Sequence, residues 1–260
     1  MDLAYTISVD QIEYWNGPAG GRWAESQPRI DKSLAAITEL LFPFAAPREG
    51  ERVLDVGCGC GTTTLRLASL GCDVTGIDVS APMLSVARAR GARVIEGDAA
   101  QAPGSYDLIF SRFGVMFFAD PVAAFGHLRT LTRRFAFVCW RAFENNTWAR
   151  EPLAVSHDLL PPLPPADPRA PGPFAFADRT WLEQILPGAE LTAADTTMWM
   201  GATVEEAVTE GLTIGPLSRA AADLDDPTKD RIRERLATMY ARYATPSGVQ
   251  MPAAVWLVRA

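Results

Sequence analysis

Residues 53–61 read Val-Leu-Asp-Val-Gly-Cys-Gly-Cys-Gly, and they carry the clearest structural pattern in the chain. Its apolar start predicts a buried β-strand, and we expect a helix to begin directly after the last glycine. The three alternating glycines predict a turn that a ligand approaches closely, because glycine has no Cβ to keep a ligand at a distance. Asp78 and Asp98 stand at the ends of the next two predicted strands. Together these residues predict a ligand site at one edge of a sheet.

Strands and helices are predicted to alternate along the first half of the chain. The predicted strands are residues 51–57, 73–78, 92–97, 106–111 and 134–140, and the predicted helices are 61–70, 80–90 and 120–131. Helices of this length between apolar strands are typical of a parallel, doubly wound α/β sheet with helices on both faces. Ligands of such sheets bind beyond the carboxyl ends of the strands, where the glycine turn and both acids are expected to lie.

The composition argues against several classes of protein. The chain has 260 residues, 48% of them apolar, which suits one domain with a large core, or one domain with an insertion. Lys and Arg total 24 against 31 Asp and Glu, and the net charge of −7 argues against a nucleic-acid partner. We find no signal peptide and no apolar run of about eighteen residues that would span a membrane, so we expect a cytoplasmic protein. The four cysteines lack C-x-x-C spacing and a histidine cluster, which predicts reduced thiols and no zinc.

The acids at the strand ends admit two interpretations. Singly, each could be a helix cap or a turn residue. Combined with the glycine turn, Asp78 has the spacing expected of a carboxylate that accepts both hydroxyl groups of a ribose. A nicotinamide dehydrogenase shares this acid, but its G-x-G-x-x-G motif would need a glycine in place of Thr62. Glycine at position 61 and acids at positions 55 and 98 favour a sulfonium cofactor instead.

Three segments carry a resemblance to a known family. They are residues 53–59, residues 78–84 (Asp-Val-Ser-Ala-Pro-Met-Leu) and residues 106–111 (Tyr-Asp-Leu-Ile-Phe-Ser). In these segments the chain resembles the class I S-adenosylmethionine-dependent methyltransferases of the small-molecule branch, including those of ubiquinone and menaquinone synthesis. The resemblance covers residues 47–140 well and the C-terminal half only by element order. It implies a Rossmann-like sheet of seven strands, mostly parallel, whose last strand, 249–259, is antiparallel.

The resemblance also implies S-adenosylmethionine as the cofactor and the residues that hold it. Asp55 would orient the glycine turn and meet the ammonium group, directly or through water. Asp78 would bind the ribose, and Asp98 would receive the adenine amino group. The implied set of cofactor-binding residues is Asp55, Gly57, Gly59, Gly61, Asp78, Val79, Met83, Asp98, Ala99, Ser111, Phe113 and Trp23.

The sequence identifies the site of the methyl acceptor less well. Methyl transfer from a sulfonium needs alignment and the exclusion of water more than a fixed catalytic group. Arg112, Trp140 and Trp148 are candidate acceptor contacts, although Arg112 could equally form a structural ion pair and the two aromatic residues could equally be core. His157 is the candidate general base. Aromatic side chains favour a small aromatic, quinone-like or polyketide-like acceptor, and we predict no metal.

Four regions are predicted along the chain: a helical cap at 1–46, the cofactor-binding core at 47–140, a proline-rich segment at 141–177, and at 178–260 the rest of the sheet with a helical insertion. In the cap, Asp31 is expected to begin an amphipathic helix. Residues 14–18, with Trp23, either cover the cofactor or form an ordinary packed helix. The proline-rich segment is either a lid or a rigid surface connection.

Three functions are compatible with these patterns. The first is a methyltransferase that acts on a small molecule. The second is a protein that binds S-adenosylmethionine without catalysis, as a scaffold or regulator, because its binding motifs would be the same. The third is a nicotinamide-dependent oxidoreductase. Methylation of a nucleic-acid base is not expected, since residues 111–114 (Ser-Arg-Phe-Gly) lack the Asn/Asp-Pro-Pro-aromatic motif of those enzymes.

Overall fold

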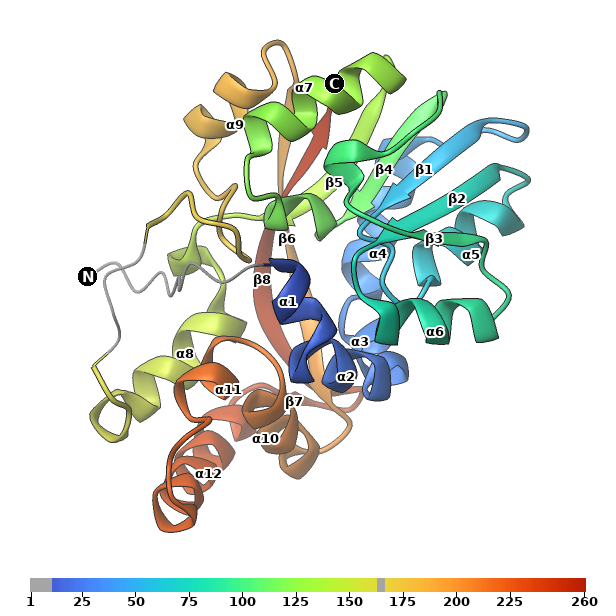
Figure 1. The fold of residues 1–260 in the computed structure, drawn as a ribbon. Helices are drawn as coiled ribbons and strands as arrows, with labels where there is room; N and C mark the ends of the chain where they lie inside the picture. Colours follow the sequence, from blue (N-terminus) through green and yellow to red (C-terminus); the bar gives the residue numbers. More distant parts are fainter. Residues whose placement is uncertain (1–10, 163–166) are drawn as a thin grey trace.

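The computed structural model describes residues 11–162 and 167–260, which form one mixed sheet with helices on both faces (Figure 1). The strand order is β3-β2-β1-β4-β5-β8-β6, and β7 pairs with β8. The strands are β1 Arg52–Val56, β2 Asp73–Asp78, β3 Val94–Glu96, β4 Leu108–Arg112, β5 Phe135–Trp140, β6 Glu190–Gly201, β7 Ala244–Thr245 and β8 Gly248–Arg259.

The first five strands are parallel to one another, and β8 is antiparallel to both of its neighbours, β5 and β6. This confirms the mostly parallel sheet with an antiparallel last strand. The difference from the prediction is small: β7, a strand of two residues, makes the sheet eight-stranded instead of seven-stranded.

Helices cover the sheet and build a second layer around its long C-terminal strands. The helices are α1 Gln11–Asn16, α2 Pro18–Glu25, α3 Gln27–Ser33, α4 Ala35–Ala45, α5 Thr62–Ser69, α6 Ala81–Ala89, α7 Pro121–Leu131, α8 Thr147–Ser156, α9 Arg179–Ile185, α10 Val204–Thr213, α11 Pro216–Ala220 and α12 Asp226–Ala241. In Figure 1, α4 and α5 lie behind the sheet and α7 lies in front of it. Of these helices, α8 and α11 were not predicted. None of the helices described is both long and apolar enough to cross a bilayer.

The central strands are buried because helices cover both faces of the sheet. Every residue of β5 is buried, and so are the last four residues of β1. From β1 the chain runs outward through β2 and β3, then returns to place β4 on the other side of β1. The space beyond the carboxyl ends of β1 and β4 is therefore the switch point of the sheet, where ligands of such folds bind.

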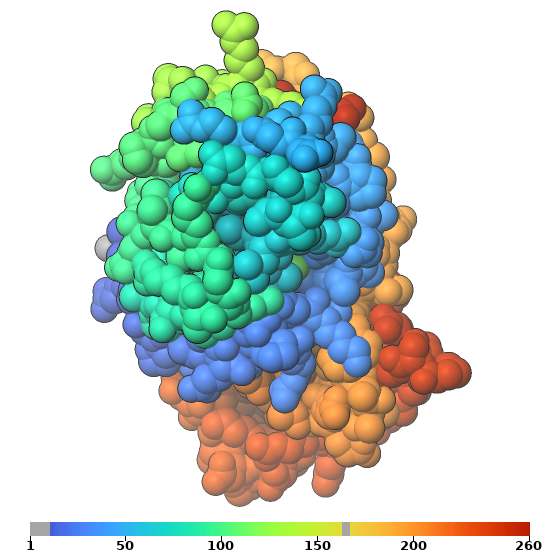
Figure 2. Space-filling model, turned by 90° about the vertical axis from the view of Figure 1, so that its right-hand side faces the viewer, coloured from blue at the N-terminus to red at the C-terminus, as the bar shows by residue number. Residues whose placement is uncertain are grey.

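The strands β6 and β8 are twelve residues long and pair along their whole length. They extend past the parallel strands and carry the helices α8, α10 and α12 at their far end (Figure 1). The N-terminal helices α1–α3 lie between the parallel part of the sheet and these C-terminal helices (Figure 2). The switch point of the sheet is thereby covered by the N-terminal cap.

One prediction within the cap is wrong. Asp31 lies inside α3 instead of starting a helix, and the residue before α4 is Leu34, which makes no side-chain cap. Residues 1–10 and part of the proline tract, 163–166, lie outside the described residues.

Candidate functional site

A cavity of about 960 Å³ lies at the carboxyl ends of β1–β4, beneath the N-terminal cap. This volume suits a ligand as large as a nucleoside derivative, since ligand pockets commonly measure about 300–1,000 Å³. Most of the predicted site residues line it: Trp23, Gly57, Gly59, Asp78, Val79, Met83, Asp98, Ala99, Arg112 and Phe113. Residues separated widely in the sequence are thus brought to one place by the ends of successive strands.

The glycine turn after β1 presents bare backbone to this cavity. Gly59 has a left-handed backbone with φ of +52°, and a Cβ added to it would meet only the sulfur of Met83, at 3.6 Å. Gly57, with φ of +64°, lies against another segment, because its added Cβ would stand 2.5 Å from the Cα of Gly114. Gly59 therefore leaves space for a ligand, whereas Gly57 allows two backbone segments to pack closely.

Asp78, the last residue of β2, is buried in the wall of the cavity. Its Oδ2 accepts a hydrogen bond from the Gly59 N–H at 2.8 Å, and its Oδ1 accepts one from the Ser80 N–H at 2.9 Å. Burial raises the pKa of this carboxyl above its ordinary value. A carboxylate has about four lone-pair sites, so Asp78 can hold the glycine turn and still accept hydrogen bonds from a ligand.

Asp98 and Ala99 form the next part of the wall, after β3. Asp98 accepts a hydrogen bond from the Ala100 N–H at 2.8 Å and so caps the 3-10 turn Ala99–Gln101. As the first residue of that turn, Ala99 has no partner for its N–H within the turn. A ligand ring lying here would find one carboxylate and one backbone donor side by side.

Three predicted cofactor residues do not line the cavity. An added Cβ on Gly61 would meet Ala87 and Ala92 at 3.0 Å, so this glycine lets the start of α5 pack against α6. The Ser111 hydroxyl donates to the Val56 carbonyl at 2.8 Å and thus joins β4 to β1. Direct ligand contact by Gly61 or Ser111 finds no support in this geometry.

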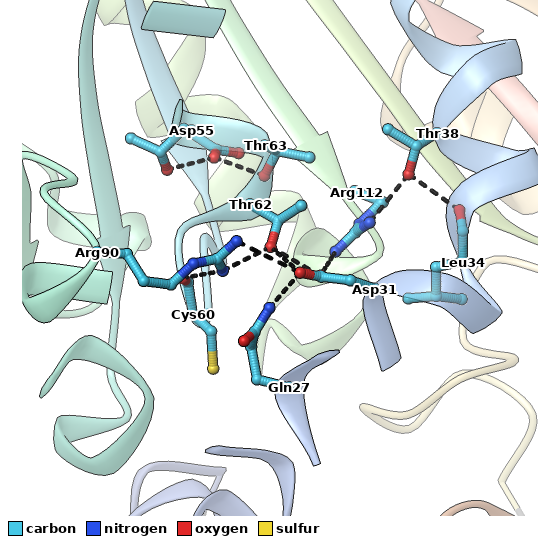
Figure 3. Close-up of polar contacts among 12 residues, drawn as sticks. Gln27, Asp31, Leu34, Thr38, Asp55, Cys60, Thr62, Thr63, Arg90 and Arg112 are labelled. Atoms are coloured by element: carbon cyan, nitrogen blue, oxygen red, sulfur yellow. Dashed lines mark hydrogen bonds and ion pairs between the residues drawn. The ribbon is translucent and has the colours of Figure 1, made fainter. Parts of the chain in front are cut away.

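Asp55, the third, is fully buried in β1. Its Oδ2 accepts hydrogen bonds from the Thr63 and Thr64 hydroxyls, each at 2.7 Å, and so fixes the start of α5 (Figure 3). Among the described residues, its Oδ1 has no hydrogen-bond partner. Burial raises the pKa of Asp55 to about 6. Asp55 therefore fixes the start of the helix that follows the glycine turn, and it does not line the cavity.

Asp31 lies in helix α3 of the cap and lines the larger cavity, although the sequence predicted it as a helix cap. Its carboxylate accepts hydrogen bonds from the Thr62 hydroxyl at 2.7 Å and from Gln27, and it lies 3.4 Å from Arg90 Nη2 (Figure 3). Arg112 Nη2 lies 3.7 Å from the same carboxylate. A single acid in α3 thus joins the cap to α5, α6 and β4.

Of the two interpretations that the sequence left open for Arg112, the structure shows the ion pair. Arg112 pairs with Asp31, and its Nη1 donates to the Thr38 hydroxyl at 2.9 Å. It also lines the large cavity. Burial lowers the pKa of its guanidinium, while Asp31 and Asp55 act in the opposite direction.

The cap is also hydrogen-bonded to the loop that follows β2. Asn16 donates to the Val79 carbonyl at 2.8 Å and accepts from the Ala81 N–H at 3.0 Å. The Ser80 hydroxyl donates to the Trp15 carbonyl at 2.7 Å. These bonds hold the indole rings of Trp15 and Trp23, 5.7 Å apart and edge to face, in the wall of the cavity.

A second, smaller cavity of about 130 Å³ adjoins the first. Six residues line both cavities: Trp15, Trp23, Ile30, Leu34, Phe113 and Phe117. The predicted acceptor contacts Trp140 and Trp148 line the smaller cavity. Their rings lie 4.8 Å apart, and Trp140 stacks on Phe113 at 4.3 Å.

Phe113 forms part of the boundary between the cavities in a strained conformation. Its φ is +70°, which is rare for a bulky residue, and such strain clusters at functional sites. The strain places an aromatic ring directly after β4, in contact with both cavities.

His157, the candidate base, lines neither cavity. It lies in the 3-10 turn after α8, its side chain is 78% exposed, and its Nδ1 is 3.2 Å from the Ala154 carbonyl oxygen. The prediction of His157 as a base is therefore not supported, because α8 carries it away from the site. Over the described part of the chain, no three His, Cys, Asp or Glu side chains gather as they would around a metal ion.

Comparison with known proteins agrees with this geometry. Residues 53–134, from β1 to the start of β5, match the family model described as a methyltransferase domain. The chain contains a class I methyltransferase domain. The methyltransferase domain includes the glycine turn, Asp78, Asp98 and Arg112, which confirms the family resemblance seen in the sequence.

Two curated relatives and two solved structures place the methyltransferase domain in context. A ubiquinone biosynthesis O-methyltransferase of Bordetella parapertussis is 36% identical over 118 residues, covering 40% of this chain and 48% of that protein. Its counterpart in Bordetella pertussis is 30% identical over 155 residues, covering 54% and 64%. The chain thus spans about half the length of the first of these relatives.

The solved structures extend the fold beyond the methyltransferase domain. Phosphoethanolamine N-methyltransferase 2 of Haemonchus contortus, in complex with S-adenosyl-L-methionine, has a TM-score of 0.55 at 16% identity and covers 96% of this chain and 60% of its own. The YcgJ protein from Bacillus subtilis has a TM-score of 0.53 at 18% identity and covers 85% and 95%. At these identities the likeness concerns the fold alone.

Proposed function

We propose that this protein transfers a methyl group from S-adenosylmethionine to a small-molecule acceptor. The observation that carries the proposal is the pair of adjoining cavities, one built from a glycine turn and strand-end acids and the other from aromatic side chains. A donor site and an acceptor site that share a wall are what an in-line displacement needs.

The larger cavity is the proposed donor site. Asp78 would accept hydrogen bonds from the ribose, and Asp98 with the Ala99 N–H would bind the adenine. Gly59 leaves space beside Met83 for the nucleoside. The bound donor would supply an activated methyl group, and the faces of Trp15 and Trp23 would attract its positive charge.

The smaller cavity is the proposed acceptor site. Trp140 and Trp148 contribute flat apolar surfaces, which favour an aromatic, quinone-like or polyketide-like molecule. Burial between the cap and the C-terminal helices would exclude water from the reacting atoms. No base is assigned. The positive charge on sulfur already activates the S–CH₃ bond of the donor, and alignment of donor and acceptor supplies much of the rate.

Titration calorimetry tests the donor assignment. We expect S-adenosylmethionine and S-adenosylhomocysteine to bind and NAD not to bind. Asp78→Ala should weaken binding of both adenosyl ligands by about 1.5–3 kcal/mol, the range for a hydrogen bond to a charged group. Tight binding of NAD without a response to the adenosyl ligands would overturn the proposal in favour of an oxidoreductase.

Catalysis is tested separately, with a donor whose methyl group carries a label. The full chain is incubated with fractionated metabolite pools, and we expect label in a small molecule and none in DNA or RNA. Donor binding without transfer to any fraction would favour a scaffold or regulator over an enzyme. The Asp78→Ala variant is the matched control, since it retains the acceptor cavity.

A further inference from the structure

The inner end of the smaller cavity carries polar groups that the methyltransferase domain does not explain. Ser33, the last residue of α3, lines this cavity and is 97% buried, since only 3% of its surface is exposed. Its hydroxyl has no hydrogen-bond partner in the described part of the chain. Leaving a buried hydroxyl unpaired costs about 1–3 kcal/mol, so such a group is expected to meet a ligand.

Glu210, on α10, is a second polar residue of the same cavity and is 5% exposed. Its Oε2 accepts a hydrogen bond from Arg29 Nη1 at 2.9 Å. Arg29 and Ser33 are four residues apart on α3, so they lie on the same face of that helix. Ser33 and Glu210 therefore line one cavity, and Glu210 is paired with a residue one helical turn before Ser33.

The rest of this cavity is small and mostly apolar, although Arg22, Thr213, Ser218 and Arg219 also line it. Trp23 and Phe113 separate it from the larger cavity, and Trp140 and Phe174 form further walls. A volume of about 130 Å³ is well below the usual range for whole ligands, and it suits a single ring. Ser33 and Glu210 do not line the larger cavity, so they lie on the side away from the proposed donor.

We propose that the smaller cavity binds a hydroxylated aromatic ring of the acceptor, and that Ser33 and Glu210 select this ring through hydrogen bonds to its hydroxyl group. This rests on the proposed function and names its substrate class. The carboxylate of Glu210 accepts a hydrogen bond from the hydroxyl group of the ring. The hydroxyl of Ser33 donates a hydrogen bond to the oxygen of the same group. The atom to be methylated then faces the wall formed by Trp23 and Phe113. Glu210 and Ser33 are specificity-determining residues, because a ring without a hydroxyl leaves both unpaired.

The test compares phenol and toluene as probes of one size. Each is titrated calorimetrically into the full chain saturated with S-adenosylhomocysteine. We expect phenol to bind at least about tenfold more tightly than toluene, because a hydrogen bond to a charged group has this strength.

Two variants test which residues produce the preference for phenol over toluene. In Glu210→Gln we expect the preference of phenol over toluene to fall below about threefold, since the hydrogen bond is no longer to a charged group. Ser33→Ala should weaken phenol binding several-fold without weakening toluene binding. Because Ser33→Ala removes an unpaired buried hydroxyl, its Tm should be unchanged or raised by about 2–4 °C. Weaker binding in a protein of equal or higher Tm distinguishes ligand recognition from a structural role.

The outcomes separate this inference from the proposed function. Equal binding of phenol and toluene, or a phenol preference that survives both variants, would overturn the inference. Affinity for S-adenosylhomocysteine is measured in the same samples and should be equal in wild type and both variants. A wild-type chain that selects phenol but does not bind the adenosyl ligand would contradict the proposed function alone.

Discussion

The two cavities share a wall but are built from different parts of the chain. The larger one is formed mainly by turns that directly follow β1, β2, β3 and β4, and its lining includes backbone and four acids, Asp31, Asp78, Asp98 and Asp167. The smaller one is formed by side chains from the cap, β4–β5, the segment after α8, β6 and α10–α11. In the first, the glycine turn, Asp78 and Asp98 are each positioned by the strand beside them, and the cap adds Asp31. In the second, position depends on how distant segments pack.

This difference suggests that changes in the two cavities will have different consequences. A change in the glycine turn alters backbone that also holds β1 and β4 together, so it should affect folding and donor binding at once. A change in the smaller cavity alters side chains on separate helices, so it should affect the choice of acceptor with little cost to the fold.

The glycine turn is expected to give the largest effects. Gly57→Ala should lower the free energy of unfolding by about 2–5 kcal/mol, because a left-handed alanine is strained and its Cβ would overlap Gly114. Gly59→Ala has the same backbone strain but open space, so it should cost only about 1–2 kcal/mol. Urea denaturation measures both. Equal losses in the two variants would contradict the separate roles given to these glycines.

Asp55 provides a pH-dependent test of the same turn. Its pKa of about 6 in the folded protein exceeds the ordinary value of an aspartate, so the folded state binds more protons than the unfolded state between about pH 4 and 6. Its contribution to stability is therefore full below about pH 4 and is lost as the pH rises through 6, a change of up to about 3 kcal/mol.

The comparison of wild type with Asp55→Asn isolates this contribution, since buried Asp78 titrates in the same direction in both proteins. Measured by urea unfolding from pH 4 to pH 8, the variant should gain stability relative to wild type as the pH rises. A difference that stays constant across this range would show that the buried carboxyl does not titrate as described.

Asp31 tests the link between the cap and the donor cavity. Asp31→Asn should lower the free energy of unfolding by about 1–2 kcal/mol, because Arg112 loses a charged partner in a largely buried setting. Asp195→Asn is the matched control, since Asp195 also pairs with an arginine, Arg141, but its side chain is 86% exposed. The control should change stability by less than about 0.5 kcal/mol. Thermal unfolding of both variants decides whether Asp31 is more than a surface ion pair.

His157 should give the smallest effect. Because its side chain is exposed and lies outside both cavities, His157→Ala should leave kcat within about twofold of wild type with any acceptor found in the label-transfer screen. A decrease in kcat of tenfold or more would show that His157 takes part in the reaction, and α8 would then have to move toward the cavities.

The parts of the molecule that could be predicted are those in which sequence neighbours act together. Asp78 and Asp98 follow their own strands, so alternation of strands and helices was enough to bring them to one edge. Asp31 was misassigned because an acid before an amphipathic run has the pattern of a helix cap, and only its contact with Thr62, 31 residues away, distinguishes the two. The sequence pattern around Asp31 is the same for a helix cap and for a long-range contact, so it could not distinguish them.

The smaller cavity was predicted only through its aromatic residues. Trp140 ends a buried strand, so its place near the site followed from the sheet. Ser33 and Glu210 carried no such signal, since a serine and a glutamate on amphipathic helices are ordinarily solvated. Glu210 is buried because it meets Arg29, 181 residues away, and packing of that kind leaves no local pattern in a sequence.

A crystal structure of the chain with S-adenosylmethionine would show whether the larger cavity holds the donor as proposed. We expect the ribose on the Asp78 carboxylate, the adenine beside Asp98 and Ala99, and the sulfonium methyl group directed past Trp23 toward the smaller cavity. A donor that lies elsewhere, or one whose methyl group faces away from the smaller cavity, would contradict the proposed donor and acceptor sites.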